Sequence, residues 1–417
     1  MAKITINGGK KLNGAIKLHG AKNSVLPILA ATVLLPGISV IHNCPELSDV
    51  EAAVRILEHL GAKVTRENNT VTVDCGDLKN HTIPDDLMRE MRSSIVFLGA
   101  IAARMGKAFL SSPGGCELGP RPIDLHLTAL NELGLNIEEE HGILSCECCD
   151  GMKGTDIHLS FPSVGATENI ILAGVTAKGT TVIHGAAKEP EISDLADFLN
   201  GAGANIQGAG SDNIVIIGTP CLHAAEHTVI PDRIEAATYL AATAVTGGRI
   251  TLLGAIPAHL TPVMSVLKTA GCELSVKQNE VSLIAPVRLK RVPVIRTMPH
   301  PGFPTDAGSP LMAMLSVADG SSMFVENIFE NRFRIVDELK RFGAKIYTNG
   351  RVAVIEGVKS LSGASVECTD LRGGAALVVA ALVANGTTEI NKIHHLDRGY
   401  ERLTENLSAL GALIERC

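Results

Sequence analysis

The sequence contains no tryptophan, and aromatic residues make up only 3% of its 417 residues. Proteins that hold single-stranded nucleic acid stack its bases on aromatic side chains, so this mode of binding is not expected. The net charge of −7 also argues against nucleic acid as the main partner. With so few rings, the hydrophobic core must be built from alanine, leucine, valine and isoleucine.

Long apolar runs are missing as well. Stretches such as 24–35 and 375–384 are far shorter than the roughly 20 residues that a membrane span needs, so we expect buried helices there. The first residues show no apolar run of secretion-signal type. The ten cysteines are scattered, which favours reduced thiols over a disulfide framework. We therefore expect a cytoplasmic protein that does not enter a membrane.

An internal repeat that occurs six times is the main organisational signal. In each copy an amphipathic segment ends in a glycine that is followed by a short strand-like run. Each of these glycines is expected to end a helix in the left-handed conformation. They are Gly61, Gly134, Gly203, Gly271, Gly343 and Gly411.

A second glycine series ends an apolar segment in each copy and opens a strand: Gly37, Gly106, Gly179, Gly248, Gly320 and Gly386. Each unit is thus predicted as an apolar helix, a strand, an amphipathic helix and further strands. The apolar helix is expected to pack inside, and the amphipathic helix to face water. Six such units predict an α/β protein of two domains with three units each, separated near residues 219–231.

Function in a repeat protein is expected where the copies differ, and one such place is the start of each apolar helix. Helix N-termini offer free N–H groups and a positive dipole end, so cations gathered there suggest an anion site. Asp306 is the exception: it suits both an N-terminal cap and a general base for a hydroxyl. The six copies place Lys22, Arg92, Gly165, Arg233, Asp306 and Arg372 at this position.

The other difference is an insertion. From strand-opening to helix-ending glycine the second copy spans 28 residues, against 23 to 25 in the others, and its extra residues surround Cys116. Prolines and glycines flank this cysteine, and Arg121 and His126 follow closely. A thiol in a cationic, open loop is suited to act as a nucleophile or an acid.

Other motifs are weak. Cys146, Cys148 and Cys149 cluster, but strand alternation would split them and no histidine stands at zinc-finger spacing, so no metal is expected. The pair Gly201 and Gly203 lacks the third glycine of a dinucleotide fingerprint.

Five motifs together resemble the UDP-N-acetylglucosamine 1-carboxyvinyltransferases, members of the EPSP synthase family, from end to end. They are Gly20–Asn23, Pro113–Pro122, Pro304–Asp306, Glu330–Phe333 and Asp397–Arg402. The resemblance implies two inside-out, barrel-like α/β domains of three repeats each. Their expected extents are 22–229, and 1–21 with 230–417, so the N-terminal strand would join the C-terminal domain.

The resemblance also implies a reaction: enolpyruvate is transferred from phosphoenolpyruvate to the 3′-hydroxyl of UDP-N-acetylglucosamine and phosphate is released, the step that opens bacterial peptidoglycan synthesis. Cys116 corresponds to the proton donor, which can also carry a pyruvate-derived adduct, and Asp306 to the group facing the sugar hydroxyl. Apart from that adduct, no cofactor is implied, and we expect a monomer.

The site residues are likewise carried over from the resemblance. The catalytic residues it implies are Cys116, Asp306, Lys22 and Arg398. Those around phosphoenolpyruvate are Lys22, Asn23, Arg92, Arg121 and Arg398. The UDP-sugar contacts are Arg92, Arg121, Pro122, Ile123, Asp124, Leu125, Ser163, Val164, Gly165, Asp306 and Ile328. Supporting roles are expected for His126, Arg332 and Arg372.

Two alternatives stay open. The shikimate-pathway enolpyruvyl transferase shares the fold and phosphoenolpyruvate, but the inserted Cys116 loop favours the UDP-sugar enzyme. A non-catalytic nucleotide-sugar sensor could keep the same fold, yet Lys22, Cys116 and Asp306 are all present, which favours an enzyme.

Overall fold

The computed structural model describes residues 2–111 and 123–417, and its chain divides into two compact units. Among these residues, the C-terminal unit contains the chain up to His19 and from Pro231 onward. The N-terminal unit runs from Gly20 to Ile230. Across both described stretches, no helix combines the length and hydrophobicity of a membrane-spanning segment.

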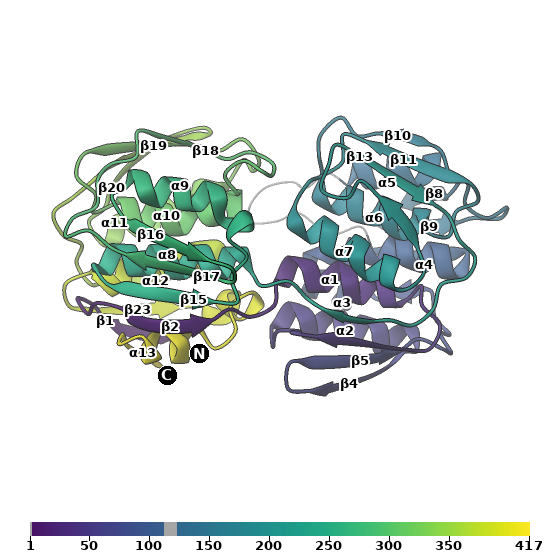
Figure 1. Ribbon diagram of the computed structural model, residues 1–417, viewed down its shortest axis with the longest axis horizontal. Coiled ribbons are helices and arrows are strands. Elements are labelled where there is room, and N and C mark those ends of the chain that lie inside the picture. The colour runs from purple at the N-terminus through teal and green to yellow at the C-terminus, as the bar shows by residue number, and fades with distance from the viewer. Residues whose placement is uncertain (1, 112–122) are drawn as a thin grey trace. The chain divides into compact units, whose positions relative to one another are not determined.

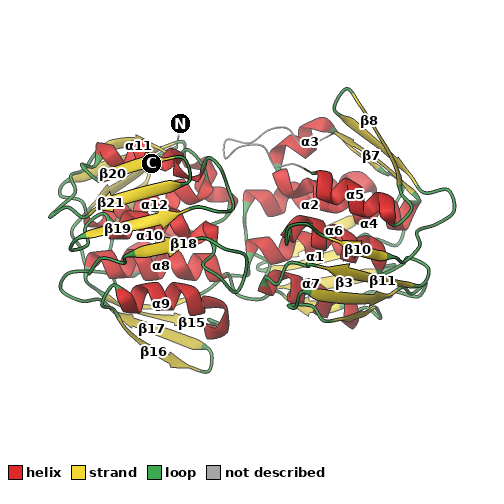
Figure 2. Cartoon of the chain, turned by 90° about the horizontal axis from the view of Figure 1, so that it is seen from above, coloured by secondary structure: helices red, strands yellow, loops and turns green. Residues whose placement is uncertain are grey.

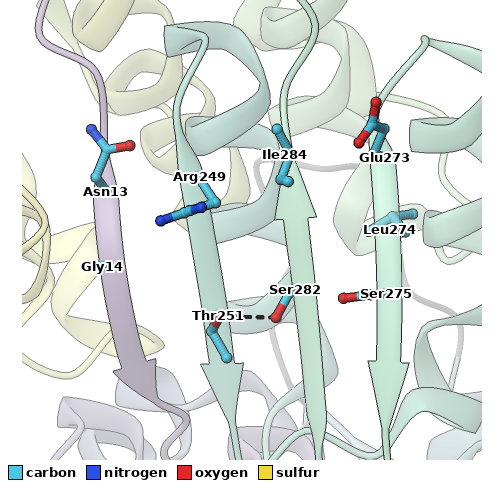
Figure 3. Close-up of a pocket in the computed structure, with 9 residues that line it drawn as sticks. All are labelled: Asn13, Gly14, Arg249, Thr251, Glu273, Leu274, Ser275, Ser282 and Ile284. Carbon is cyan, nitrogen blue, oxygen red and sulfur yellow. Dashed lines mark hydrogen bonds between the residues drawn. The ribbon is translucent and has the colours of Figure 1, made fainter.

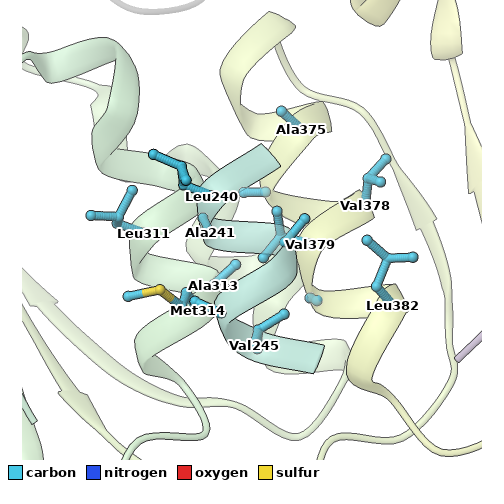
Figure 4. Close-up of a cluster of buried hydrophobic side chains, with 14 of the residues drawn as sticks. Leu240, Ala241, Val245, Leu311, Ala313, Met314, Ala375, Val378, Val379 and Leu382 are labelled. Carbon is cyan, nitrogen blue, oxygen red and sulfur yellow. The ribbon is translucent and has the colours of Figure 1, made fainter. Parts of the chain in front are cut away.

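The six apolar segments form helices that are almost completely buried, as expected. In the C-terminal unit α8, α10 and α12 pack against one another through small and branched aliphatic side chains (Figure 4). In the N-terminal unit α4 contacts both α1 and α6. The bounds are α1 (Lys22–Thr32), α4 (Phe97–Met105), α6 (Val164–Gly174), α8 (Arg233–Thr246), α10 (Gly308–Leu315) and α12 (Leu371–Val383).

A second set of helices buries only one face, because its apolar residues recur every three or four positions. They are α2 (Ser48–Leu60), α5 (Asp124–Glu132), α7 (Pro190–Gly201), α9 (Thr261–Thr269), α11 (Ile335–Arg341) and α13 (Leu403–Ala409). The repeat glycines that follow them all have φ between 88° and 108°. The prediction that each ends its helix in the left-handed conformation is confirmed.

In the second glycine series five members also have positive φ, but Gly248 does not. In the fourth copy the preceding Gly247 takes the left-handed conformation, with φ 70°, and ends α8. Short helices complete the connections: α3 (Asp85–Glu90), η1 (Arg92–Val96), η2 (Pro257–Leu260), η3 (Thr305–Ala307), η4 (Arg332–Arg334) and η5 (Ile393–Arg398).

Within residues 2–111 and 123–417 the strands form six four-stranded sheets, three in each unit. In the N-terminal unit the orders are β14 (Glu226–Thr228), β3 (Ile38–His42), β5 (Thr70–Asp74), β4 (Lys63–Glu67); β6 (Thr82–Ile83), β7 (Lys107–Ser111), β9 (Ile143–Glu147), β8 (Asn136–Glu140); and β10 (Asp156–His158), β11 (Thr180–His184), β13 (Asn213–Ile217), β12 (Asn205–Gln207). In each of these sheets the first pair is parallel and the others antiparallel.

The C-terminal unit repeats this arrangement. Its orders are β2 (Asn13–Lys17), β15 (Arg249–Leu253), β17 (Glu280–Ile284), β16 (Glu273–Lys277); β18 (Val294–Arg296), β19 (Ser321–Val325), β21 (Val352–Glu356), β20 (Lys345–Asn349); and β22 (Ser365–Glu367), β23 (Thr387–Asn391), β1 (Ile4–Asn7), β24 (Leu413–Arg416). In both units the buried helices lie between the sheets (Figures 1 and 2). This is the expected inside-out arrangement.

The first strands of the chain belong to the C-terminal unit. β1 pairs with β23 and β24, and β2 pairs with β15. The N-terminal strands therefore complete two sheets of the C-terminal unit. The segment between the third and fourth copies contains a strand that was not predicted from the sequence. This strand, β14, pairs with β3 of the first copy.

A buried carboxylate holds the chain just before it leaves the C-terminal unit at His19. Glu235 accepts hydrogen bonds from the His19 main-chain N–H at 2.9 Å and from its ring Nδ1 at 2.8 Å. Glu401 lies 3.8 Å from the ring Nε2. Burial lowers the pKa of His19, but the bond to Glu235 and the two negative charges outweigh it, so the pKa is raised above 6.5.

Since the folded-state pKa of His19 is raised, its ion pair stabilises the protein fully below pH 6.5, and this stabilisation is lost as the pH rises through the folded-state value. His19→Gln is therefore expected to lower the denaturant midpoint most at acidic pH, with a smaller difference at pH 9. Guanidinium unfolding across that range measures this. His59→Gln, on the exposed face of α2, serves as the control. A pH-independent difference would contradict the assignment.

Candidate active site

The residues that differ between the repeats all lie at helix starts, as expected. Lys22 and Arg233 are the first residues of α1 and α8, and Arg92 is the first of η1, which leads into α4. Gly165 and Arg372 are the second residues of α6 and α12, and Asp306 lies in η3 before α10. Each unit therefore collects functional candidates at the N-termini of its buried helices.

In the C-terminal unit Asp306 is held between two buried arginines. Arg332 Nη2 contacts its Oδ1, while Arg372 places Nη2 3.1 Å and Nε 3.2 Å from its Oδ2. Both arginine side chains are 3% exposed and Asp306 is 26% exposed. The carboxylate is thus the part of this cluster that solvent reaches most, and two guanidinium groups fix its orientation.

The arginines are themselves positioned by neighbouring side chains. Arg332 Nε donates to the Thr305 carbonyl and hydroxyl, both at 3.2 Å. The Thr305 hydroxyl in turn donates to the buried Glu326 at 2.9 Å. The other oxygen of Glu326 accepts from the main-chain N–H of Ile328 at 2.8 Å, which connects this predicted contact residue to the same network.

Arg372 packs against Tyr400, with its guanidinium carbon 5.4 Å from the ring centroid. Burial lowers the pKa of Arg372, but Tyr400, Asp306 and Asp232 together outweigh it and raise the value. Asp232 caps α8, and Asp306 lies just before α10. The Arg372 guanidinium at the start of α12 therefore interacts with carboxylates from the starts of two other buried helices. Arg398 ends η5, two residues before Tyr400, and is half-buried.

In the N-terminal unit Lys22 is buried at the start of α1, where the helix dipole opposes a cation. Its ammonium lies 2.6 Å from Oδ2 of Asp49, in the first turn of α2. This carboxylate compensates the charge of the buried lysine. Asn23, next on α1, is half-buried.

His126 lies on α5 and is fixed by Asn169 of α6. Asn169 Oδ1 accepts from the Gly99 N–H at 2.8 Å, so its amide nitrogen is the group that donates to His126 Nδ1 at 2.8 Å. A Cβ at Gly165 would lie 2.9 Å from His126 Cε1. Only glycine there lets the imidazole approach the start of α6 this closely.

The other predicted contacts in this unit lie at the starts of α6 and α5. Ser163 caps α6 by accepting from the Ala166 N–H at 3.3 Å, and Val164 follows it. Ile123, Asp124 and Leu125 form the start of α5, with Asp124 exposed. Cys116, Arg121 and Pro122 lie outside the described residues.

A separate hollow of about 530 Å³ lies on the outer face of the sheet β2–β15–β17–β16 (Figure 3). Its floor is a row of small side chains, Thr251, Ser282 and Ser275, which the strand register aligns. None of the predicted site residues lines it, so it is distinct from the candidate site.

Three partners in these clusters were not predicted from the sequence: Asp49, Asn169 and Glu326. Each is an ordinary polar residue, and its partner belongs to another element, so nothing local marks it. The sequence shows Asp49 only as an acidic residue in the first turn of a predicted helix. Such a residue is ordinarily explained by its favourable interaction with the helix dipole.

Comparison with known proteins assigns the chain to a family. The family model for EPSP synthase (3-phosphoshikimate 1-carboxyvinyltransferase) matches residues 6–407. The chain is 53% identical over 416 residues to UDP-N-acetylglucosamine 1-carboxyvinyltransferase 2 of Caldanaerobacter subterraneus, with both chains covered completely. The chain belongs to the UDP-N-acetylglucosamine 1-carboxyvinyltransferase family. The corresponding enzyme of Finegoldia magna is 46% identical over 419 residues, covering 100% of this chain and 99% of its own.

Solved structures agree with membership of this transferase family. The enolpyruvyl transferase NikO from Streptomyces tendae has 27% identity and a TM-score of 0.89, covering 100% of this chain and 98% of its own. An EPSP synthase from Acinetobacter baumannii, at 22% identity and a TM-score of 0.75, shares the fold. The expected enolpyruvyl transferase fold is confirmed, and the protein is an enzyme of that class.

Gly165→Ala is expected to destabilise the protein by about 1–3 kcal/mol, because the new methyl group would displace His126 from Asn169. Gly201→Ala is the matched control, since an added Cβ there meets no atom within 4 Å. Differential scanning calorimetry of both variants tests this. Equal melting temperatures for the two variants would show that His126 can move aside without cost.

Proposed function

We propose that this enzyme transfers the enolpyruvyl group of phosphoenolpyruvate to the 3′-hydroxyl of UDP-N-acetylglucosamine and releases phosphate, opening peptidoglycan synthesis. The observation that carries the proposal is 53% identity along the entire chain to an enzyme named for this activity. The chemistry of the two described clusters supports it.

Phosphoenolpyruvate carries a phosphate and a carboxylate, so its site needs several cations. Lys22 at the start of α1 supplies one, in an orientation fixed by Asp49. We assign phosphoenolpyruvate binding to Lys22, Asn23, Arg92, Arg121 and Arg398. Arginine suits this task because its planar fork pairs with phosphate and carboxylate oxygens.

Asp306 is suited to receive the proton of the sugar hydroxyl. Its carboxylate is partly exposed and rigidly held, so one oxygen can face a hydroxyl while the arginines keep it oriented. We assign the UDP-sugar contacts to Ile328 on this side, and to residues 121–125 and 163–165.

The reaction then proceeds by addition and elimination. Cys116 delivers a proton to C3 of phosphoenolpyruvate while Asp306 accepts the proton of the 3′-hydroxyl, whose oxygen bonds to C2. The tetrahedral intermediate next loses a proton from C3 and breaks the C2–O bond to phosphate. Electrons and protons balance without an added cofactor, and Cys116 can alternatively bond to C2 as a covalent adduct.

We also infer a monomeric enzyme working in the cytoplasm. None of the cysteines among the described residues is joined in a disulfide bond, which suits a reducing compartment. Sedimentation analysis tests the monomer, and intact-mass measurement with and without phosphoenolpyruvate tests the adduct.

The decisive assay is release of inorganic phosphate from phosphoenolpyruvate. Release should require UDP-N-acetylglucosamine and should not occur with shikimate 3-phosphate as acceptor. Release with the shikimate compound instead would identify the related enzyme, and no release with either acceptor would favour a sensor.

Cys116→Ala is expected to lower kcat by at least about 100-fold, because a general acid contributes on that order. Cys149→Ala, which removes an exposed cysteine, is the control and should retain wild-type activity. Steady-state phosphate release measures both. Full activity of Cys116→Ala would remove this thiol from the mechanism.

Asp306→Asn keeps the shape of the side chain but not its basicity. We expect kcat to fall by roughly 10²–10⁴-fold, with a smaller change in both KM values. Because the change also weakens the pairing of two buried arginines, the melting temperature should be measured beside the kinetics. Asp337→Asn, on the exposed side of α11, is the control. A change confined to KM would make Asp306 a binding residue only.

A further inference from the structure

A buried carboxylate outside the predicted site gathers three hydrogen bonds in the N-terminal unit. Asp194 of α7 is 4% exposed. Its Oδ2 accepts from the Ser24 hydroxyl and, at 3.2 Å, from the Ile230 main-chain N–H. Its Oδ1 lies 2.8 Å from Nε2 of His227. Both oxygens of this carboxylate are therefore occupied by donors from other segments.

These donors come from two places of functional interest. Ser24 is the third residue of α1 and is fully buried, directly after Lys22 and Asn23. Ile230 is the last residue of the N-terminal unit, and its carbonyl accepts from the Ala21 N–H at 2.7 Å. Asp194 thus ties the first turn of α1 to the segment by which the chain leaves the unit.

The first turn of α1 has no side-chain cap at its N-cap residue. A helix begins with N–H groups that have no partner within the helix, and a side-chain cap commonly satisfies one of them. Among the described residues, none caps α1 in this way, because its N-cap residue is Ala21. The Ser24–Asp194 bond fixes this turn from the side instead.

The repeats show that the fold itself does not require a carboxylate here. Asp194 stands nine residues before the helix-ending Gly203. The equivalent residues in the other five copies are Ala52, Leu125, Pro262, Arg334 and Arg402. Burying a carboxylate is costly unless donors compensate it, so Asp194 marks a requirement particular to this copy.

We propose that Asp194 is a positioning residue for the enzyme: through Ser24 it sets the orientation of the first turn of α1, and so of Lys22 and Asn23. The inference rests on the proposed function insofar as these two residues bind phosphoenolpyruvate. Asp194 acts through Ser24 and does not itself touch the substrate. Its effect is expected on phosphoenolpyruvate binding and not on binding of the sugar nucleotide.

The test removes the tether at Ser24. Ser24→Ala should raise KM for phosphoenolpyruvate roughly tenfold, the effect of losing a hydrogen bond to a charged group, and leave KM for UDP-N-acetylglucosamine within about twofold. Ser24→Thr should retain binding, since threonine keeps the hydroxyl that donates to Asp194. The control is Ser316→Ala, which removes an equally buried hydroxyl that donates to the Met312 carbonyl.

Hydrogen exchange gives a readout that needs no activity. Amides at the start of α1 should exchange faster in Ser24→Ala, and at the wild-type rate in Ser24→Thr and Ser316→Ala. Unchanged exchange in Ser24→Ala would overturn the proposal, as would faster exchange with an unchanged KM for phosphoenolpyruvate in an otherwise active enzyme. A wild-type protein that releases no phosphate would overturn the proposed function. The exchange rates would still test whether the Ser24–Asp194 bond fixes the first turn of α1.

Discussion

The structure depends on one constraint: helices without a polar face must be buried on all sides. Three such helices in each unit pack together, as α8, α10 and α12 do, and leave the sheets to face water. The consequence for chemistry lies at their ends. A buried helix begins at the rim of the core, where its free N–H groups and positive dipole end can meet a ligand.

Charges placed at those ends need compensation, and the protein supplies it locally. Lys22 has Asp49, while Arg332 and Arg372 share Asp306. Each ion pair restricts a side chain that would otherwise adopt several rotamers. The charges are costly to bury, but their pairing fixes the orientation of the side chains in the site. Glu235 and Asp194 extend the same principle to the places where the chain passes between the units.

Much of this could be predicted because it is encoded by neighbours in the sequence. The helix-ending glycines, the apolar and amphipathic helices, and the placement of Lys22 and Asp306 at helix starts all follow from local periodicity. The pairing of β14 with β3 could not be predicted in this way. The two strands stand more than 180 residues apart in the sequence, and β14 is a short polar segment without a strand pattern.

The amino-acid sequence by itself determined the repeat, the two-domain α/β class and the residues that depart from the repeat, because these depend on spacing and residue type. Only the tertiary structure decided which charges meet. Arg372 reaches Asp306, and Asn169 reaches His126, through contacts made when helices from different repeats pack together. Such contacts are set by the shape of the core, and no local pattern in the chain records them.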